Sequence, residues 1–167
     1  MRPHAPRNVL QLRISPDWDT VKATWDASQA MLRESGLDND DAYALSMVSQ
    51  ELLENAVKYG KFERGDAVAF EIRVSDEFVT IEVRSPVSES GESALREFDQ
   101  MVQWVRSFAD PFEAYVERMR AVSSQPYAAG KSGLGLARIA YEGRCLLDFY
   151  VDDSSTLAVS AVFRRAA

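Results

Sequence analysis

The stretch VAFEIRVSDEFVTIEVRS, residues 68–85, decides the fold class of this chain. Apolar and polar residues alternate along residues 68–74 and again along residues 79–83, which is the pattern of strands with one buried face. Only a short link, Asp76–Glu77, separates the two runs, so they predict an antiparallel hairpin. One face of this hairpin needs a covering layer, and the flanking segments are predicted to supply it.

The flanking segments show helical or strand periodicity and carry recognisable start and stop residues. Ser15 is expected to cap the first helix, with Pro16 in its first turn, and Gly36 and Gly60 are expected to end the first two helices. The expected elements are strand 8–15, helix 15–36, helix 38–59, the hairpin, two short helices within 93–122 that break at Pro111, helix 134–143, and strands 145–153 and 156–165. This order predicts an α/β (α+β) two-layer sandwich, in which helices cover one face of a mostly antiparallel mixed sheet.

The length and composition indicate one domain. The chain has 167 residues, 46% of them hydrophobic, which is enough for a full core. We therefore expect a single domain over residues 1–167, with a disordered tail at residues 1–7. Residues 86–131 are expected to form a helical insertion or lid before a glycine-rich loop.

Charge and residue counts exclude several function classes. The net charge of −7 disfavours nucleic acid and anionic membrane surfaces as partners. No stretch is apolar enough to span a membrane, and we expect no signal peptide and a cytoplasmic location. The single cysteine, Cys145, lies in an apolar run and is expected to be a buried, inert thiol. The single histidine, His4, lies in the tail, which argues against histidine-based catalysis or metal binding.

The stretch AAGKSGLGLARI, residues 128–139, contains the Gly-Lys-Ser that ends a phosphate loop of the Walker type. The first glycine of that motif should be at position 125, where this chain has Gln125, so the Walker interpretation is rejected. What remains is Gly130, Gly133 and Gly135 at a helix start, where backbone N–H groups favour anions. A plain glycine-rich loop is the alternative interpretation.

The stretch SQELLENAVKYG, residues 49–60, is the second candidate site. Glu51 and Asn55 are one helical turn apart, beside the stripe of the helix that is expected to be buried. A carboxylate next to an amide oxygen suits a general base close to Mg²⁺. The alternative is a solvated helix face with a Glu54–Lys58 pair.

The two stretches together, in this order and separated by a hairpin, resemble the histidine-kinase-like ATPase (GHKL or Bergerat) superfamily. ELLENAVKYG is similar to its N-box and GKSGLGLARI to its G2 box. The resemblance implies ATP and Mg²⁺ as cofactors, Glu51 as general base, Asn55 as metal ligand and Lys58 as a phosphate contact. The residues that it implies around the triphosphate are Gly130, Lys131, Ser132, Gly133, Leu134 and Gly135.

Within this superfamily the chain resembles the anti-sigma-factor serine kinases, and especially the SiaB-like protein kinases. Those relatives carry helices between the hairpin and the glycine loop, as residues 93–122 are expected to do here. The resemblance implies a serine/threonine kinase in a bacterial partner-switching system. Its expected partner is a STAS-type anti-sigma antagonist or a sigma factor, and a homodimer is compatible with the sequence.

One departure from the superfamily pattern concerns the adenine site. An Asp-x-Gly-x-Gly box usually follows the hairpin, but Ser85 or a near neighbour takes the aspartate position here, and Ser88 and Glu89 are alternative substitutes. Losing a charged contact of this kind costs on the order of 1–3 kcal/mol of binding free energy. Two alternatives to a kinase therefore stay open: a nucleotide-free, pseudokinase-type binding module that sequesters a partner, and a small ATP hydrolase.

Overall fold

The computed structural model describes residues 7–87, 92–124 and 133–166. In chain order, the helices and strands of this part of the chain are β1 (Asn8–Ile14), α1 (Trp18–Glu34), α2 (Asn39–Tyr59), β2 (Val68–Val74), β3 (Phe78–Pro86), α3 (Glu92–Arg106), α4 (Pro111–Ser124), α5 (Leu134–Tyr141), β4 (Cys145–Val151) and β5 (Thr156–Arg164).

The strands form one sheet in the order β1-β2-β3-β5-β4. The predicted hairpin pairs β2 with β3, and Val74 lies opposite Val79 at its closed end. All four pairings among the described strands are antiparallel, so the sheet is wholly antiparallel and not mixed. This arises because β5 turns back from β4 and inserts between β4 and β3.

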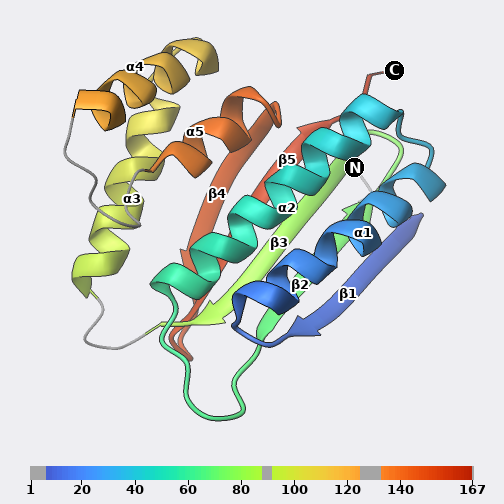
Figure 1. Ribbon diagram of the computed structural model, residues 1–167, viewed down its shortest axis with the longest axis horizontal. Coiled ribbons are helices and arrows are strands. Elements are labelled where there is room, and N and C mark those ends of the chain that lie inside the picture. Colours follow the sequence, from blue (N-terminus) through green and yellow to red (C-terminus); the bar gives the residue numbers. More distant parts are fainter. Residues whose placement is uncertain (1–6, 88–91, 125–132, 167) are drawn as a thin grey trace.

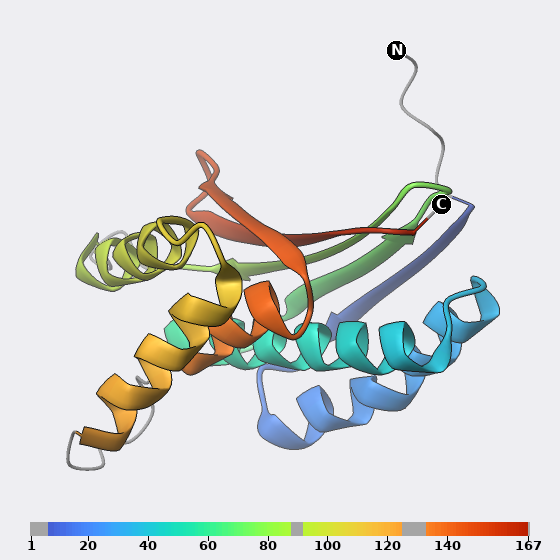
Figure 2. The same cartoon turned by 90° about the horizontal axis from the view of Figure 1, so that it is seen from above.

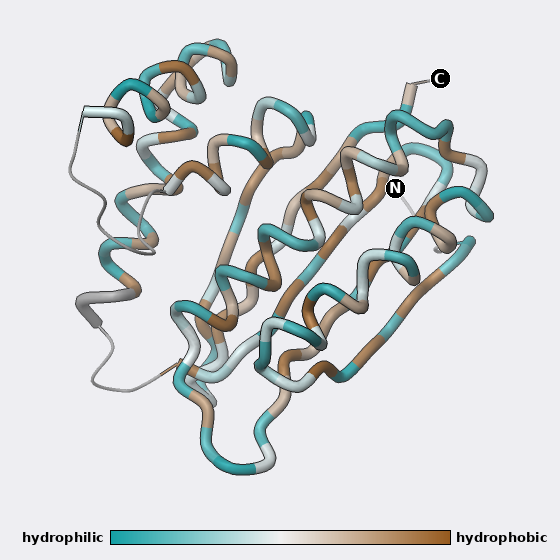
Figure 3. The backbone as a smooth tube through the Cα atoms, viewed as in Figure 1, coloured by the Kyte–Doolittle hydropathy of each residue, from teal (hydrophilic) through white to brown (hydrophobic). Residues whose placement is uncertain are grey.

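The molecule has the two layers that the sequence predicts. Helices α1, α2 and α5 lie against one face of the sheet, while α3 lies beside β4 and α4 packs against α5 (Figures 1 and 2). The helices bury the apolar side chains on this face of the sheet. In β2 every second side chain is only 0–1% exposed: Val68, Phe70, Ile72 and Val74. Figure 3 shows this alternation of hydrophobic and hydrophilic residues along the strands. Each such side chain contributes about 1.5–3 kcal/mol when fully buried.

Local chemistry sets the helix boundaries, and in one case corrects the prediction. Helix α1 begins at Trp18 and is capped by Asp17, whose side chain accepts a hydrogen bond from the Thr20 N–H at 2.8 Å. The expected cap at Ser15 is therefore wrong. The insertion does form two helices, because α3 ends at Arg106 and α4 begins at Pro111, a position where the missing N–H of proline costs nothing.

Two further expectations concern the chain start and the cysteine. Arg7, expected in the tail, donates its N–H to the Val74 carbonyl at 2.8 Å, whereas residues 1–6 lie outside the described part. Cys145 is buried as predicted, its thiol contacts the Gly143 carbonyl at 3.2 Å, and burial raises its pKa to about 12. Among the described helices, none combines the length and apolarity needed to cross a bilayer.

Candidate active site

Helix α2 presents Glu51 and Asn55 beside its buried face. Leu45, Val48 and Leu52 are 0–1% exposed and face the sheet. The Glu51 side chain lies beside this buried stripe of the helix and is 17% exposed. The amphipathic pattern therefore places this carboxylate at the edge of the core, as predicted, and not on the solvated face.

The glycine-rich segment meets α2 at Glu51. Arg138 of α5 donates from Nη1 to Glu51 Oε1 at 2.7 Å, across 87 positions of sequence. The other oxygen, Oε2, lies only 2.3 Å from where a Cβ on Gly135 would stand. Glu51 is thus packed directly against the first turns of α5, and the two stretches that the sequence singled out are neighbours in space.

Opposing effects act on the Glu51 carboxyl. Burial is the largest and raises its pKa above the usual value for glutamate. The positive charge of Arg138 opposes this increase, and the negative charge of Glu54 adds to it. The net effect is upward, so this carboxyl binds a proton more readily than an exposed glutamate does.

Asn55 lies one turn further along α2 and is partly buried. Its Nδ2 atom is buried and has no hydrogen-bond partner among the described residues. Buried polar groups are nearly always paired in proteins, so this amide is not used to hold the described fold together. A side-chain amide offers an oxygen acceptor as well as a nitrogen donor, which makes Asn55 suitable as a ligand for Mg²⁺.

No group of three or more His, Cys, Asp or Glu side chains forms a metal cage within residues 7–87, 92–124 and 133–166. Mg²⁺ is commonly held by one or two protein oxygens together with substrate phosphates and water. The residues present fit a Mg²⁺ site shared between protein, phosphates and water, with the Asn55 amide oxygen as the protein ligand.

Lys58 is exposed in the last turn of α2, and its ammonium lies 5.6 Å from the centre of the Tyr59 ring. Tyr59 in turn lines a hollow that Gly133, at the start of α5, also lines. The end of α2 that carries Lys58 therefore lies near the glycine-rich segment. A contact of Lys58 with phosphate stays a prediction.

The start of α5 has the backbone shape that needs glycine. Gly133 takes the N-cap position with φ of 63°, in the left-handed region. A Cβ at this position would lie 2.7 Å from Met101 Cε and 3.2 Å from Arg118 Nε. Gly133 supplies no side-chain cap to α5, which begins at Leu134. Helix starts generally favour anions. Gly130, Lys131 and Ser132 lie outside the described residues.

The hollow beside Gly133 measures about 330 Å³ and lies between the end of α2, the two inserted helices and the start of α5. Its lining combines two aromatic rings with polar and charged side chains: Tyr59, Glu97, Gln100, Met101, Trp104, Arg118 and Gly133. A hollow of this composition is suited to part of an organic ligand.

Ser85 lies on the covered face of β3 and is 3% exposed. It pairs with Leu157 of β5. The next residue, Pro86, accepts a 2.9 Å hydrogen bond from the Lys61 N–H, so this end of β3 lies beside the end of α2. Ser85 is therefore on the same side of the sheet as Asn55, although the described contacts do not join the two. The alternatives Ser88 and Glu89 lie outside the described residues.

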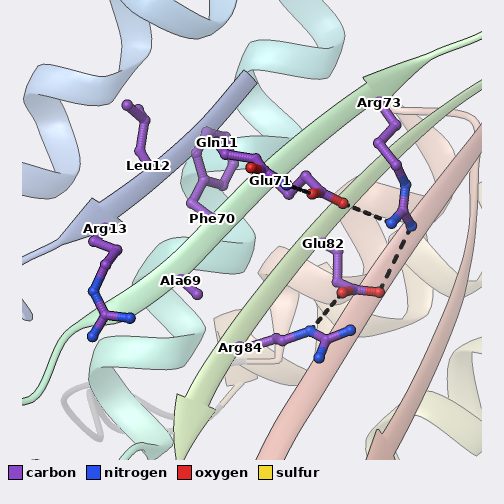
Figure 4. A pocket seen from close by; sticks show the side chains of 9 residues that line it. All are labelled: Gln11, Leu12, Arg13, Ala69, Phe70, Glu71, Arg73, Glu82 and Arg84. Atoms are coloured by element: carbon purple, nitrogen blue, oxygen red, sulfur yellow. Dashed lines mark hydrogen bonds and ion pairs between the residues drawn. The ribbon is translucent and has the colours of Figure 1, made fainter. Parts of the chain in front are cut away.

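Another hollow, of about 360 Å³, lies on the opposite face of the sheet (Figure 4). There Arg73 Nη1 contacts Glu71 at 2.6 Å and Arg73 Nη2 lies 3.9 Å from Glu82, while Arg84 contacts Glu82 at 2.7 Å. Partly exposed pairs like these contribute little stability each. None of the predicted site residues lines this hollow, so it is separate from the candidate site.

Arg138 is the residue that sequence reasoning missed. It also contacts Glu142, one turn later, at 3.1 Å from Nε and 3.3 Å from Nη2. A signal was available, because Arg138 lies three residues after Gly135 and hence on the same face of α5. The glycine spacing alone drew attention to phosphate and not to this cation.

No family model and no curated protein matches this chain. Its fold does resemble a chain in the crystal structure of the SiaB–SiaC complex from Pseudomonas aeruginosa. That chain is 17% identical, with a TM-score of 0.67, and the match covers 92% of this chain and 88% of the other. The arrangement of helices and strands described above is thus similar to the fold of a chain in the SiaB–SiaC complex.

Proposed function

We propose that this chain is an ATP- and Mg²⁺-dependent serine/threonine protein kinase that acts on a regulatory protein in a partner-switching system. One observation carries the proposal: the Glu51 carboxylate lies against the glycine-initiated start of α5. A base and a phosphate-binding helix start in direct contact are what transfer of a phosphoryl group to a hydroxyl requires.

The residues divide the chemistry as follows. The start of α5, at Gly133, would hold the phosphates, and Asn55 would hold Mg²⁺ through its amide oxygen. Glu51 accepts the proton of the acceptor hydroxyl while the hydroxyl oxygen bonds to the γ-phosphorus. At the same time the bond between the γ-phosphorus and the β-phosphate oxygen breaks, and ADP leaves. Bound Mg²⁺ supplies positive charge to the phosphate oxygens. The upward shift of the Glu51 pKa makes this carboxylate a stronger base than an exposed one.

Two observations favour a protein as the acceptor of the phosphoryl group: the fold similarity and the net charge of this chain. The structural neighbour was solved as a complex of SiaB with SiaC, which favours a protein partner for this chain as well. The net charge of −7 disfavours nucleic acid. We therefore propose a STAS-type protein as acceptor, and a sigma factor as the alternative partner.

Binding and transfer are tested separately with the full chain. Calorimetry is expected to show Mg²⁺-dependent ATP binding that Asn55→Ala weakens and Glu51→Gln leaves in place. Transfer of label from γ-labelled ATP to a STAS-domain protein from the same genome is expected to fall about 10²- to 10⁴-fold in Glu51→Gln. Glu34→Gln is the control, since Glu34 is an exposed glutamate at the end of α1 and is not among the charges that act on the Glu51 carboxyl.

The outcomes separate the three functions. Tight ATP binding with phosphate release but no labelled acceptor indicates an ATP hydrolase. Failure to bind ATP at millimolar concentration, with or without Mg²⁺, refutes both enzymes and leaves the binding module. The uncharged, buried Ser85 at the expected adenine position is the observation that favours that module.

A further inference from the structure

Three charged side chains from two helices form one connected cluster at the candidate site. Arg138 lies between Glu51 of α2 and Glu142 just after α5, at 2.7 Å and 3.1 Å from their nearest oxygens. The Arg138 side chain is 34% exposed, and that of Glu51 is 17% exposed. The Glu142 side chain is 36% exposed, so the contact to Glu51 is the more shielded of the two. Charge-assisted hydrogen bonds gain strength when water is excluded.

One oxygen of Glu51 is held by a hydrogen bond, and the other occupies the space that Gly135 leaves open. Oε1 accepts the hydrogen bond from Arg138 Nη1. Oε2 faces Gly135 so closely that any side chain there would overlap it. The carboxylate thus lies against the first turn of α5 and is hydrogen-bonded to a cation in its second turn.

The second acid fixes Arg138 in turn. Glu142 accepts from Nε and Nη2, which leaves Nη1 directed at Glu51. This arrangement uses the planar, forked geometry of a guanidinium, whose donors point in set directions. A lysine carries the same charge, but its single ammonium cannot reproduce both contacts at once.

We propose that Arg138 is a positioning residue, which holds the Glu51 carboxylate at the start of α5 in the orientation needed to meet an acceptor hydroxyl. The consequence for turnover rests on the proposed kinase function, whereas the positioning of Glu51 stands on the geometry alone. Two rival roles exist for the same contact: a strut that only joins α2 to α5, and a brake that keeps Glu51 away from substrate.

The kinetic test compares Arg138→Gln, Arg138→Lys and a control, Arg144→Gln. Arg144 also joins this part of the chain to α2, through Asp41, but it does not touch Glu51. We expect Arg138→Gln to lower kcat for phosphoryl transfer about 10- to 100-fold, with KM for ATP within about twofold of wild type. Arg138→Lys is expected to recover part of this loss, and Arg144→Gln to keep wild-type kcat.

A double variant tests whether Arg138 acts through Glu51. Adding Arg138→Gln to Glu51→Gln is expected to lower kcat no further, because the group being positioned is already gone. Independent, additive losses refute the proposal. So does a rise in kcat in Arg138→Gln, which would identify Arg138 as a brake.

A readout without nucleotide keeps this inference separate from the kinase proposal. The carboxyl ¹³C resonance of Glu51 is expected to shift in Arg138→Gln, and its relaxation to indicate greater mobility, while both stay unchanged in Arg144→Gln. If the resonance is unaffected, Arg138 does not position Glu51, whether or not the chain transfers phosphate. If it responds as expected but wild type transfers no phosphate, the positioning is upheld and the kinase function fails.

Discussion

At the scale of single residues, Gly135 shows how a motif can serve two purposes. Glycines at a helix start admit phosphate, and this is the role that the resemblance implies. The structure adds a steric reason, because a Cβ at Gly135 would overlap Glu51 Oε2 at 2.3 Å. The absence of a side chain at Gly135 therefore makes room for the Glu51 carboxylate, in addition to the phosphate role that the resemblance implies.

Substitution Gly135→Ala tests this steric role. Alanine is favoured over glycine in helices by about 1 kcal/mol, so propensity alone predicts a gain in stability. The overlap with Glu51 is expected to outweigh this and to lower the free energy of unfolding by about 1–3 kcal/mol, as measured by denaturant titration.

The matched variant is Gly135→Ala combined with Glu51→Ala, which removes the atoms that overlap. We expect it to recover at least half of the lost stability. A single Gly135→Ala variant as stable as wild type, or more stable, would show that Glu51 moves aside without cost and that the close contact is not a constraint.

At the scale of elements, α3 is anchored through aromatic contacts to both layers. Phe98 is 2% exposed, and its ring lies 5.8 Å from that of Tyr59 in α2 and 5.3 Å from that of Phe149 in β4. Val102 and Val105 are buried on the same face of the helix, as the helical spacing predicts. The inserted helix is thus packed on the scaffold, and its action as a lid remains a prediction.

Substitution Phe98→Ala is expected to loosen this anchor. Loss of a buried phenylalanine typically costs about 3–5 kcal/mol of unfolding free energy. Because the contacts of Phe98 lie at one end of the molecule, hydrogen exchange should accelerate in α3 and α4 more than in α1 or β2.

The control for this prediction is Phe112→Ala in α4, whose side chain is 46% exposed and stacks on Tyr141 at 5.1 Å. We expect it to cost under about 1.5 kcal/mol. Uniform acceleration of exchange across the whole chain in Phe98→Ala would instead show that α3 and the scaffold unfold as one unit.

At the scale of the whole molecule, the buried Glu51 carboxyl is expected to lower the free energy of unfolding once the pH is high enough to ionise it. A carboxyl whose pKa is higher in the folded than in the unfolded chain binds more protons when folded. Glu51 is such a group, because burial raises its pKa. Its contribution to stability is complete below the unfolded value, about 4.3, and is lost as the pH rises through the folded value.

The variant Glu51→Gln isolates this contribution, because it cannot titrate. We expect the free energy of unfolding of Glu51→Gln minus that of wild type to increase as the pH rises from about 4 and to level off above the folded pKa. Urea titrations across this range measure it. A difference that decreases with pH would mean that Arg138 lowers the pKa more than burial raises it.

Much of the architecture follows from local sequence. Alternation along residues 68–85 specifies the hairpin, and helical spacing specifies which face of α2 is buried. The one helix start that was misplaced, Ser15 instead of Asp17, differs by two residues because several neighbouring side chains can cap. The sequence by itself determined these features because period, caps and turns depend on residues that are close along the chain.

The tertiary structure alone decided how the site is assembled. The insertion of β5 between β3 and β4, the contact of Arg138 with Glu51 and the steric demand on Gly135 all join distant segments. Local periodicity carries no information on such contacts, since they depend on how the layers pack and on which side chains meet there. The sequence named the carboxylate and the glycines, and the packing of α5 on α2 showed that Glu51 lies against Gly135. It also showed that Arg138 links Glu51 to the exposed Glu142.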